Sequence, residues 1–403
     1  MEPRDLSDHD TYEAGRGIAE VARELGRDPD EFVKLASNEN PHGPSERATE
    51  AIRRGADRVN VYPKASHTDL QDAVADRWAV DPAQVWLANG ADGAIDCLCR
   101  AMLDPWDRVL VPDPGFAYYP MSARFHHGEV STYELSGAAF DDVAEAVLRA
   151  YEGERMVFLT SPHNPTGGTV PLAEVAQIAD ETAEHTLVVV DEAYAEFAPV
   201  PSAVSMLGGA SQHVPGLHDL DPGGPGRGTG PERATATETG AEHRNRDDVA
   251  VLRTFSKAYG LAGIRLGYAV VPGAWADAYA RVNTPFSAGE LACRAGLAAL
   301  DDDEHVRRSV ASARRAREYM RDRLDAPVLP SHANFVLVDV GDAGAVTEAT
   351  KRRGVIVRDC TSFGLLDRVR ITCGTESETE RAVEVVNEVL AERARETESE
   401  PEP

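Results

Sequence analysis

One short stretch, TFSKAYGLAGIRLGY, contains Lys257, one of only four lysines in a chain that has thirty-seven arginines. A lysine amine attacks a carbonyl only while it is neutral, and burial or a nearby cation lowers its pKa enough to allow this. Arginine keeps its proton and cannot act as such a nucleophile. Lys257 is therefore a candidate for covalent chemistry with a carbonyl compound. An ordinary surface lysine would leave its hydroxylated and basic neighbours unexplained.

Three hydrogen-bonding side chains flank this lysine. Thr254 and Ser256 supply hydroxyl donors, and Arg265 supplies a cation whose fork suits a phosphate. Upstream, NGADGAID opens a predicted helix with small residues, so that the backbone N–H groups of Gly90, Ala91 and Asp92 can approach an anion. A glycine in a strand-to-helix turn is common. This motif therefore indicates an anion site only in combination with the other motifs.

Two further motifs follow strand-like runs. In TSPHNPTGG, Asn164 precedes a proline, a pattern that also suits a plain reversal of the chain. In VVVDEAYAEF, Asp191 ends a predicted buried strand, and a buried carboxylate requires a cationic or hydrogen-bonding partner. A structural salt bridge would meet this requirement, and so would the protonated ring nitrogen of a cofactor.

Together, SPHNPTG, DEAY and TFSKAYGLAGIRLGY resemble, in this order and spacing, the fold-type I pyridoxal-phosphate enzymes of the aminotransferase class I and II superfamily. The resemblance covers nearly the whole chain and implies pyridoxal 5'-phosphate as the cofactor. It makes Lys257 the lysine that forms an imine with the cofactor and moves the substrate proton. It makes Asp191 the partner of the pyridinium nitrogen.

The same resemblance implies further contacts with the cofactor. Asn164 and Tyr194 would bond to the ring hydroxyl oxygen, and Phe116 would stack on the ring, with Tyr119 as a competitor for that place. Tyr62 matches a family tyrosine that reaches the phosphate of the neighbouring subunit, which implies a homodimer with shared active sites. The phosphate contacts implied are the amides of Ala91 and Asp92 and the side chains of Thr254, Ser256 and Arg265.

The end of the sequence carries the candidate substrate site. RVRITCGT places Arg370 where this superfamily binds the substrate carboxylate with a bidentate fork, although an arginine on an edge strand is the alternative. The runs TYEAGRGIAEVARELG, VKLASNENPHGPS and RITCGT resemble the histidinol-phosphate aminotransferases of histidine biosynthesis. Those enzymes alternate between a phosphorylated amino alcohol and glutamate, so one site must bind two unlike anions. The implied substrate contacts are Tyr12, Asn38, Asn334, Arg358 and Arg370.

Other functions compete with this interpretation. PGFAYY and RDCTSFGL also resemble the threonine-phosphate decarboxylases of cobalamin biosynthesis, which would share the cofactor and the lysine but release carbon dioxide. A broader aromatic amino-acid aminotransferase is a further alternative. The ASNENP run and the N-terminal pattern favour the histidinol-phosphate enzymes. A regulatory binding protein with this fold would have lost Lys257 or Asp191, and a transcription factor would carry a DNA-binding segment.

The elements that must position these residues alternate regularly. From about Val85 to Val271, short β-branched runs alternate with helix-like segments, which is typical of βαβ units and a mostly parallel, buried sheet. The sequence predicts a large three-layer α/β/α domain and a smaller α+β domain. The predicted limits are 1–45 for an N-terminal segment that joins the small domain, 46–275 for the large domain with a flexible insertion at 208–248, 276–392 for the small domain and 393–403 for a disordered acidic tail.

Composition narrows the partners and the setting. The net charge of −27 argues against nucleic-acid and anionic-membrane partners, and the excess of acidic residues with few lysines suits a high-salt cytoplasm. The polar, acidic start does not resemble a secretory signal, which favours the cytoplasm. The five cysteines show no zinc spacing and are expected to be free thiols. Histidines in the predicted insertion are expected to be scattered and solvated, so no metal site is predicted.

Overall fold

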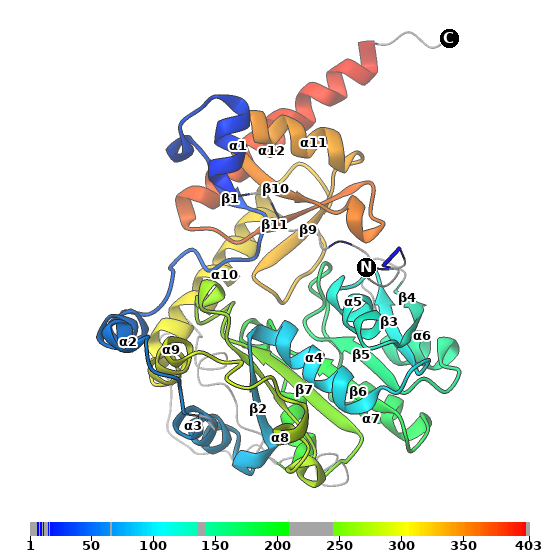
Figure 1. Cartoon of the computed structure of the whole chain (residues 1–403). Coiled ribbons are helices and arrows are strands. Elements are labelled where there is room, and N and C mark those ends of the chain that lie inside the picture. Colours follow the sequence, from blue (N-terminus) through cyan, green and yellow to red (C-terminus); the bar gives the residue numbers. More distant parts are fainter. Residues whose placement is uncertain are drawn as a thin grey trace, which may run out of the picture.

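The computed structural model describes residues 6, 7, 9, 11, 15, 17–64, 67–135, 142–208 and 245–399. The predicted insertion therefore lies almost entirely outside the described residues, and so does Tyr12. Within the described ranges the chain forms two sheets that are surrounded by helices (Figure 1). No helix in these ranges is both long and apolar enough to cross a membrane.

A seven-stranded sheet forms the centre of the larger part of the molecule. Only β8 runs antiparallel to its neighbours among the described strands of this sheet, which confirms the mostly parallel arrangement. Every residue of the Val-rich strands β5 to β7 is buried, as expected for strands covered on both faces. In spatial order the strands are β2 (Val85–Ala88), β8 (Gly267–Val270), β7 (Val249–Thr254), β6 (Leu187–Asp191), β5 (Met156–Thr160), β3 (Arg108–Asp113) and β4 (Glu129–Glu134).

Helices cover both faces of this sheet and form two separate apolar cores. Alternate residues of each strand enter opposite cores, because successive side chains of a strand point to opposite faces. The three-layer α/β/α prediction is therefore confirmed. One face is covered by α4 (Gly90–Met102), α5 (Tyr118–Phe125) and α8 (Tyr279–Val282), and the other by α3 (Thr68–Trp78), α6 (Val143–Ala150) and α7 (Leu172–Glu181).

A four-stranded sheet forms the centre of the smaller part. Its edge strand β1 comes from the N-terminal segment and pairs in parallel with β10. Helix α10 (Asp303–Arg323) packs against elements of both parts (Figure 1). The sheet has the order β1 (Val33–Leu35), β10 (Val355–Asp359), β11 (Arg368–Thr372) and β9 (Phe335–Asp339), and the helices around it are α1 (Ile18–Leu25), α11 (Ala343–Arg352) and α12 (Glu376–Ser399).

Two helices differ from the organisation expected from sequence. Helix α9 (Glu290–Leu300), which the sequence assigns to the small domain, packs against α2 (Glu46–Gly55) and α3 beside the large sheet (Figure 1). Gly55 of α2 permits this close approach, since a Cβ there would lie 2.7 Å from a Leu291 methyl of α9. Helix α12 continues to Ser399, beyond the predicted start of the tail, because Ala, Glu and Arg there favour helix.

Candidate active site

The polar motifs meet at one edge of the large sheet. Asp191 ends β6 and Thr254 ends β7, and these strands are parallel neighbours. Gly90 begins α4 after β2, which runs in the same direction because two antiparallel pairings separate it from β7. Parallel strands end at the same edge of a sheet, where open α/β sheets bind ligands. The carboxyl ends of three strands therefore form the base of the site.

Asp191 is a buried carboxylate without a cationic partner among the described residues. Its Oδ2 accepts a hydrogen bond from the Tyr119 hydroxyl at 2.7 Å, and its Oδ1 accepts one from the Ala193 amide at 2.9 Å. Burial raises the pKa of Asp191 to about 6, although both hydrogen bonds oppose this rise. The structure thus presents a carboxylate whose charge a protonated ring nitrogen would compensate.

Tyr119 and Phe116 occupy different environments, which bears on their competition for the place above the cofactor ring. Tyr119 is fully buried, stacks on Phe158 at 4.6 Å between ring centres, and also bonds to the Thr160 hydroxyl at 2.9 Å. Phe116 is half-buried and meets the edge of Tyr119 at 5.5 Å. This arrangement supports Phe116 as the stacking residue and gives Tyr119 a contact with Asp191 that the sequence did not indicate.

Lys257 follows the end of β7 and is half-buried. Its Nζ lies 3.5 Å from the Ser37 carbonyl oxygen and 5.6 Å from the centre of the Tyr194 ring. Tyr194 lies just beyond β6, and its hydroxyl accepts a hydrogen bond from the Asn38 side-chain amide at 3.0 Å. The amine, the phenol and the Asp191 carboxylate thus come from the ends of two adjacent strands.

The predicted phosphate contacts form a connected group. The Ser256 amide donates to the Thr254 hydroxyl at 3.1 Å, and the two hydroxyls bond to each other at 3.0 Å. Arg265 reaches the Ser256 hydroxyl at 3.5 Å and forms an ion pair with Asp92 at 2.9 Å. Burial raises the pKa of Asp92, while Arg265 lowers it. The sequence assigned Asp92 a role through its backbone amide, whereas the structure also gives its carboxylate a partner.

Gly90 leaves space for this group. Its φ of 73° lies in the left-handed region, and a Cβ there would lie 2.4 Å from Nη2 of Arg265. Glycine therefore lets the guanidinium reach the N-terminus of α4, next to the Ala91 amide. A cation, two hydroxyls and the amides of a helix N-terminus are the donors that suit a phosphate dianion.

The two candidate anion-binding arginines lie opposite each other on antiparallel strands, Arg358 on β10 and Arg370 on β11. Arg370 is buried and donates to the Asn164 side-chain oxygen and, at 3.0 Å, to the Ala36 carbonyl. Arg358 is less buried and donates to the Ser362 hydroxyl at 3.0 Å. The structure therefore joins Arg370 directly to a predicted cofactor contact.

Asn38 and Asn334 form a buried link between the N-terminal segment and the small sheet. The Asn334 side-chain amide donates to the Asn38 carbonyl at 3.0 Å. The hydroxyl of Thr372, at the end of β11, accepts a hydrogen bond from the Asn38 backbone amide at 3.0 Å. The same hydroxyl donates to the Asn38 side-chain oxygen at 3.1 Å. Thr372 is a contact that the sequence missed, and its place two residues after Arg370 was the available signal.

His163, within the SPHNPTG motif, is a buried residue that sequence reasoning also passed over. Its Nε2 lies 3.0 Å from the Pro114 carbonyl and its Nδ1 lies 2.9 Å from the Thr166 hydroxyl. Burial lowers the pKa of this imidazole to about 4, so it is neutral and Nε2 donates to the carbonyl. It thereby connects the loop of Asn164 with the loop of Phe116.

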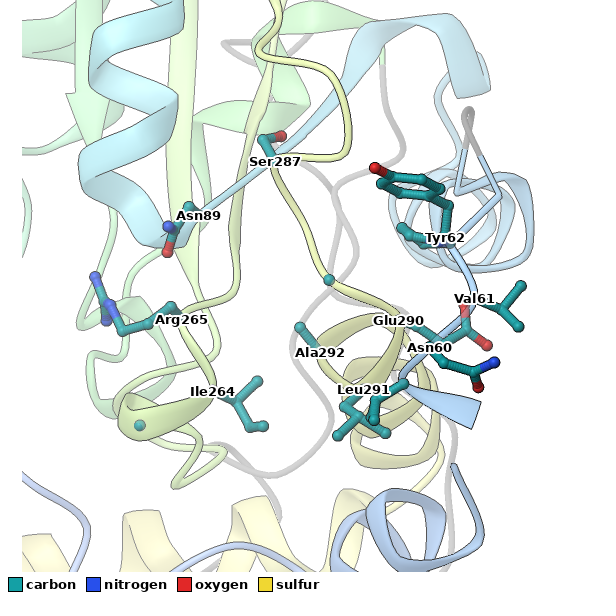
Figure 2. A pocket seen from close by; sticks show the side chains of 14 residues that line it. Asn60, Val61, Tyr62, Asn89, Ile264, Arg265, Ser287, Glu290, Leu291 and Ala292 are labelled. Atoms are coloured by element: carbon teal, nitrogen blue, oxygen red, sulfur yellow. The ribbon is translucent and has the colours of Figure 1, made fainter. Parts of the chain in front are cut away.

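A cavity of about 650 Å³ opens beside Arg265. Figure 2 shows Arg265 and Asn89 on one side of it and Tyr62 and Val61 on the other. Tyr62 is 79% exposed and stacks on the partly exposed Phe286 at 4.8 Å between ring centres. Tyr62 therefore faces the cavity and solvent. It does not bond to Thr254, Ser256 or Arg265, the predicted phosphate contacts of its own chain.

The described residues contain no group of three His, Cys, Asp or Glu side chains that could bind a metal ion. The five cysteines are free thiols, four of them buried, as the sequence predicts. The histidines of the predicted insertion lie outside the described residues.

Comparison with known proteins identifies the family. The sequence model of the family "Aminotransferase class I and II" matches residues 30–386. This chain belongs to the class I and II aminotransferases. A histidinol-phosphate aminotransferase of Haloarcula marismortui is 61% identical over 97% of this aminotransferase and 99% of its own length. One from Haloferax volcanii is 56% identical over 97% and 99%.

Solved structures show the same fold. A histidinol-phosphate aminotransferase from Sinorhizobium meliloti, in complex with pyridoxal-5'-phosphate, superposes with a TM-score of 0.76 at 24% identity, over 94% of this chain and 96% of that one. An aspartate aminotransferase from Thermus thermophilus, described as a double mutant, gives a TM-score of 0.74 at 24% identity, over 96% and 100%. At such identities the likeness concerns the fold alone.

The site fits pyridoxal phosphate on two independent observations. Asp191 is a buried carboxylate with no cation among the described residues, which suits a pyridinium nitrogen. Separately, the donors around Arg265 and the glycine that admits it suit a phosphate. The structure brings all predicted cofactor residues to this edge of the sheet except Tyr62, which lies across the cavity.

Proposed function

We propose that this aminotransferase exchanges an amino group between L-histidinol phosphate and 2-oxoglutarate with pyridoxal phosphate as cofactor. The observation that carries the proposal is the position of Lys257, whose amine lies 5.6 Å from the centre of the Tyr194 ring, just beyond a strand that pairs with the one ending in the buried Asp191. The choice of substrate is supported by relatives that bear this enzyme name at 56–61% identity over 97% of the chain.

Each residue then has a defined task. When bound, the cofactor supplies an electron-withdrawing ring that accepts the electron pair left by the substrate proton. Lys257 would hold the cofactor through its carbonyl carbon and would move the proton at the substrate carbon. Asp191 would pair with the ring nitrogen and keep a proton on it. Tyr194 and Asn164 would orient the ring through its hydroxyl oxygen, and Phe116 would pack on its face.

Arg358 and Arg370 provide the charge needed for two unlike anionic substrates. We propose that Arg370 binds the carboxylate of glutamate through its planar fork, since its guanidinium is buried between Phe335 and Phe363. Arg358, opposite on the neighbouring strand, is exposed enough to bind the more distant phosphate of histidinol phosphate. Asn38 and Asn334 fix the backbone beside them, and Tyr12 stays a predicted substrate contact.

We also propose that a second copy of the chain covers the cavity beside Arg265. Val59, Val61 and Tyr62 expose more than half of their surfaces on one wall, and an exposed apolar surface of this kind marks a contact site. In a homodimer, Tyr62 of one copy would complete the phosphate site of the other. Sedimentation equilibrium of wild type and Tyr62→Phe, with cofactor titrations, would test both parts of this proposal.

The acidic composition leads to a further proposal about the setting of the enzyme. With a net charge of −27, the excess acidic side chains repel one another at low salt, and high salt screens this repulsion. We therefore propose that the enzyme is adapted to a high-salt cytoplasm and loses stability on dialysis to low salt. An unfolding midpoint that is independent of salt concentration would contradict this.

An assay with defined substrates tests the function. Purified enzyme with histidinol phosphate and 2-oxoglutarate is expected to form glutamate, because both anions fit one site. Threonine phosphate is expected to release no carbon dioxide, and aromatic amino acids are expected to react more slowly. Carbon dioxide from threonine phosphate, without glutamate formation, would establish the decarboxylase instead.

A further inference from the structure

A buried ionic network lies directly behind the candidate site. Arg253 is 2% exposed, and its two terminal nitrogens donate to Glu192 (4% exposed) at 2.7 Å and to Glu196 (2% exposed). Replacing a buried ion pair by apolar residues is often neutral or stabilising, so stability alone does not explain such a network. We call these three residues the Arg253 network.

Every member of the network lies within two positions of a candidate site residue in the sequence. Glu192 follows Asp191, and Arg253 precedes Thr254. Glu196 is two residues beyond Tyr194. The network therefore joins the ends of β6 and β7 at the point where both strands deliver side chains to the site.

The network and the site lie on opposite faces of the sheet end. Val190 and Val251 enter the core that contains α3 and α7, and Glu192 and Arg253 continue the same alternation. Val189 and Leu252 enter the other core, and Asp191 and Thr254, two positions after them, continue that opposite alternation. The Arg253 network consequently contacts both strand ends from the face of the sheet that packs on α3 and α7, and it occupies no space in the site.

Further contacts anchor the network to the rest of the large part. The Arg253 guanidinium lies 4.9 Å from the centre of the Trp78 ring, and the Trp78 indole donates to the Tyr268 hydroxyl at 2.9 Å. Glu192 also accepts from the Ser202 hydroxyl and the Ala203 amide, both at 2.6 Å. The network is thus connected to α3, to β8 and to the segment after β6.

We propose that Arg253, Glu192 and Glu196 are positioning residues that set the distance between Asp191 and Thr254, and thereby the fit of pyridoxal phosphate. This inference rests on the proposed function. The rigid fork of Arg253, on β7, bonds to two carboxylates of the segment that directly follows β6, which fixes the separation of the two strand ends. A lysine at position 253 would keep the charge but has a single nitrogen and no fork, so it would lose this geometric constraint.

The chain offers a matched control at the other end of the same strand. Arg246 lies just before β7 and likewise bonds to two carboxylates, Asp180 and Asp248, each at 2.6 Å. Its substitution removes a comparable doubly bonded arginine that is far from the carboxyl ends of the strands. Arg246→Lys therefore reports what such a loss does to stability alone.

The test compares cofactor binding by wild type, Arg253→Lys, Arg246→Lys and Glu196→Gln. Pyridoxal phosphate is titrated into the cofactor-free proteins, folding is checked by circular dichroism, and unfolding midpoints are recorded. Arg253→Lys and Glu196→Gln are expected to raise the dissociation constant of the cofactor about ten-fold to a hundred-fold, as small misplacements do in preorganised sites. Arg246→Lys is expected to lower the midpoint but to leave the dissociation constant within about two-fold of wild type.

The outcomes separate this inference from the proposed function. If wild type binds the cofactor and Arg253→Lys and Glu196→Gln bind it equally well, the positioning role is wrong and the function stands. An equal loss in Arg246→Lys would likewise overturn it, because the effect would then follow stability. If Arg253→Lys does not fold, Glu196→Gln alone decides, since it retains the shape of the side chain. Wild type that does not bind pyridoxal phosphate would contradict the proposed function itself.

Discussion

Removing the Tyr119 hydroxyl tests how far this one hydrogen-bond donor lowers the pKa of Asp191. Tyr119→Phe keeps the ring that stacks on Phe158 and deletes only the donor that lies 2.7 Å from the carboxylate. A hydrogen bond to a charged group contributes about 1.5–3 kcal/mol, which corresponds to roughly one to two pKa units. The pKa of Asp191 in the cofactor-free protein should therefore rise from about 6 by that amount.

The sign of the stability change follows from linkage. A carboxyl group whose pKa is raised on folding contributes stability below its unfolded pKa, and this contribution is lost as pH rises through the folded pKa. For Asp191 the rise from 3.8 to about 6 corresponds to a loss of about 3 kcal/mol between pH 4 and pH 7. In Tyr119→Phe this loss should grow to about 4–6 kcal/mol and extend beyond pH 7.

Denaturant unfolding of the cofactor-free protein across this pH range measures the effect, with high salt present throughout. Asp191→Asn serves as the reference, because subtracting its curve leaves the contribution of the Asp191 charge. Nearby Asp92 and Glu192 also raise the pKa of Asp191, and both are present in every variant. Identical difference curves for wild type and Tyr119→Phe would refute the view that this hydroxyl stabilises the ionised carboxylate.

Three further predictions concern the rest of the site. Gly90→Ala should weaken cofactor binding about ten-fold or more, since its Cβ would collide with Arg265 and its φ is unfavourable for alanine; a titration with pyridoxal phosphate checks this, and unchanged affinity would contradict the proposed phosphate site. His163 has a pKa lowered to about 4, so its contribution to stability is present above its unfolded pKa near 6.5 and is lost as pH falls toward 4. The difference in free energy of unfolding between wild type and His163→Gln should therefore shrink by about 3 kcal/mol on acidification. A difference that does not change with pH would show that the imidazole is not buried in its neutral form. Arg370→Lys should raise the KM for glutamate about ten-fold to a hundred-fold, because one ammonium cannot replace a bidentate fork; steady-state kinetics with both substrates measure this, and an unchanged KM would place the carboxylate elsewhere.

The local motifs made much of the site predictable. Asp191 could be placed at a strand end because four apolar residues precede it, and Thr254 because it follows the apolar run 249–252 after a single arginine. The parallel sheet then brought those ends together. Lys257 was indicated by its chemistry in a chain otherwise rich in arginine. Gly90 and the helix that follows it were evident from the turn. These inferences use residues that are neighbours in the sequence.

Contacts between distant residues could not be predicted in the same way. Tyr119 meets Asp191 across 72 positions of sequence, and Asn38 meets Thr372 across 334. The Arg253 network depends on the register of β6 against β7, which the sequence does not specify. The packing of α9 beside α2 was missed because it depends on a close approach between Gly55 and Leu291, which are far apart in the sequence. The predicted roles of Tyr12 and of the insertion concern parts of the chain outside the described residues.

A single-turnover reaction directly tests the proposed transfer of an amino group from histidinol phosphate. Cofactor-loaded enzyme is mixed with histidinol phosphate alone, and the keto product is counted before and after 2-oxoglutarate is added. About one keto product per chain is expected in the first step and glutamate in the second, as in a ping-pong reaction that depends on Lys257 and in which the bound cofactor carries the amino group between the steps. Lys257→Ala should give neither. Continuous product formation without 2-oxoglutarate, or the same yield from Lys257→Ala, would contradict the proposed transamination.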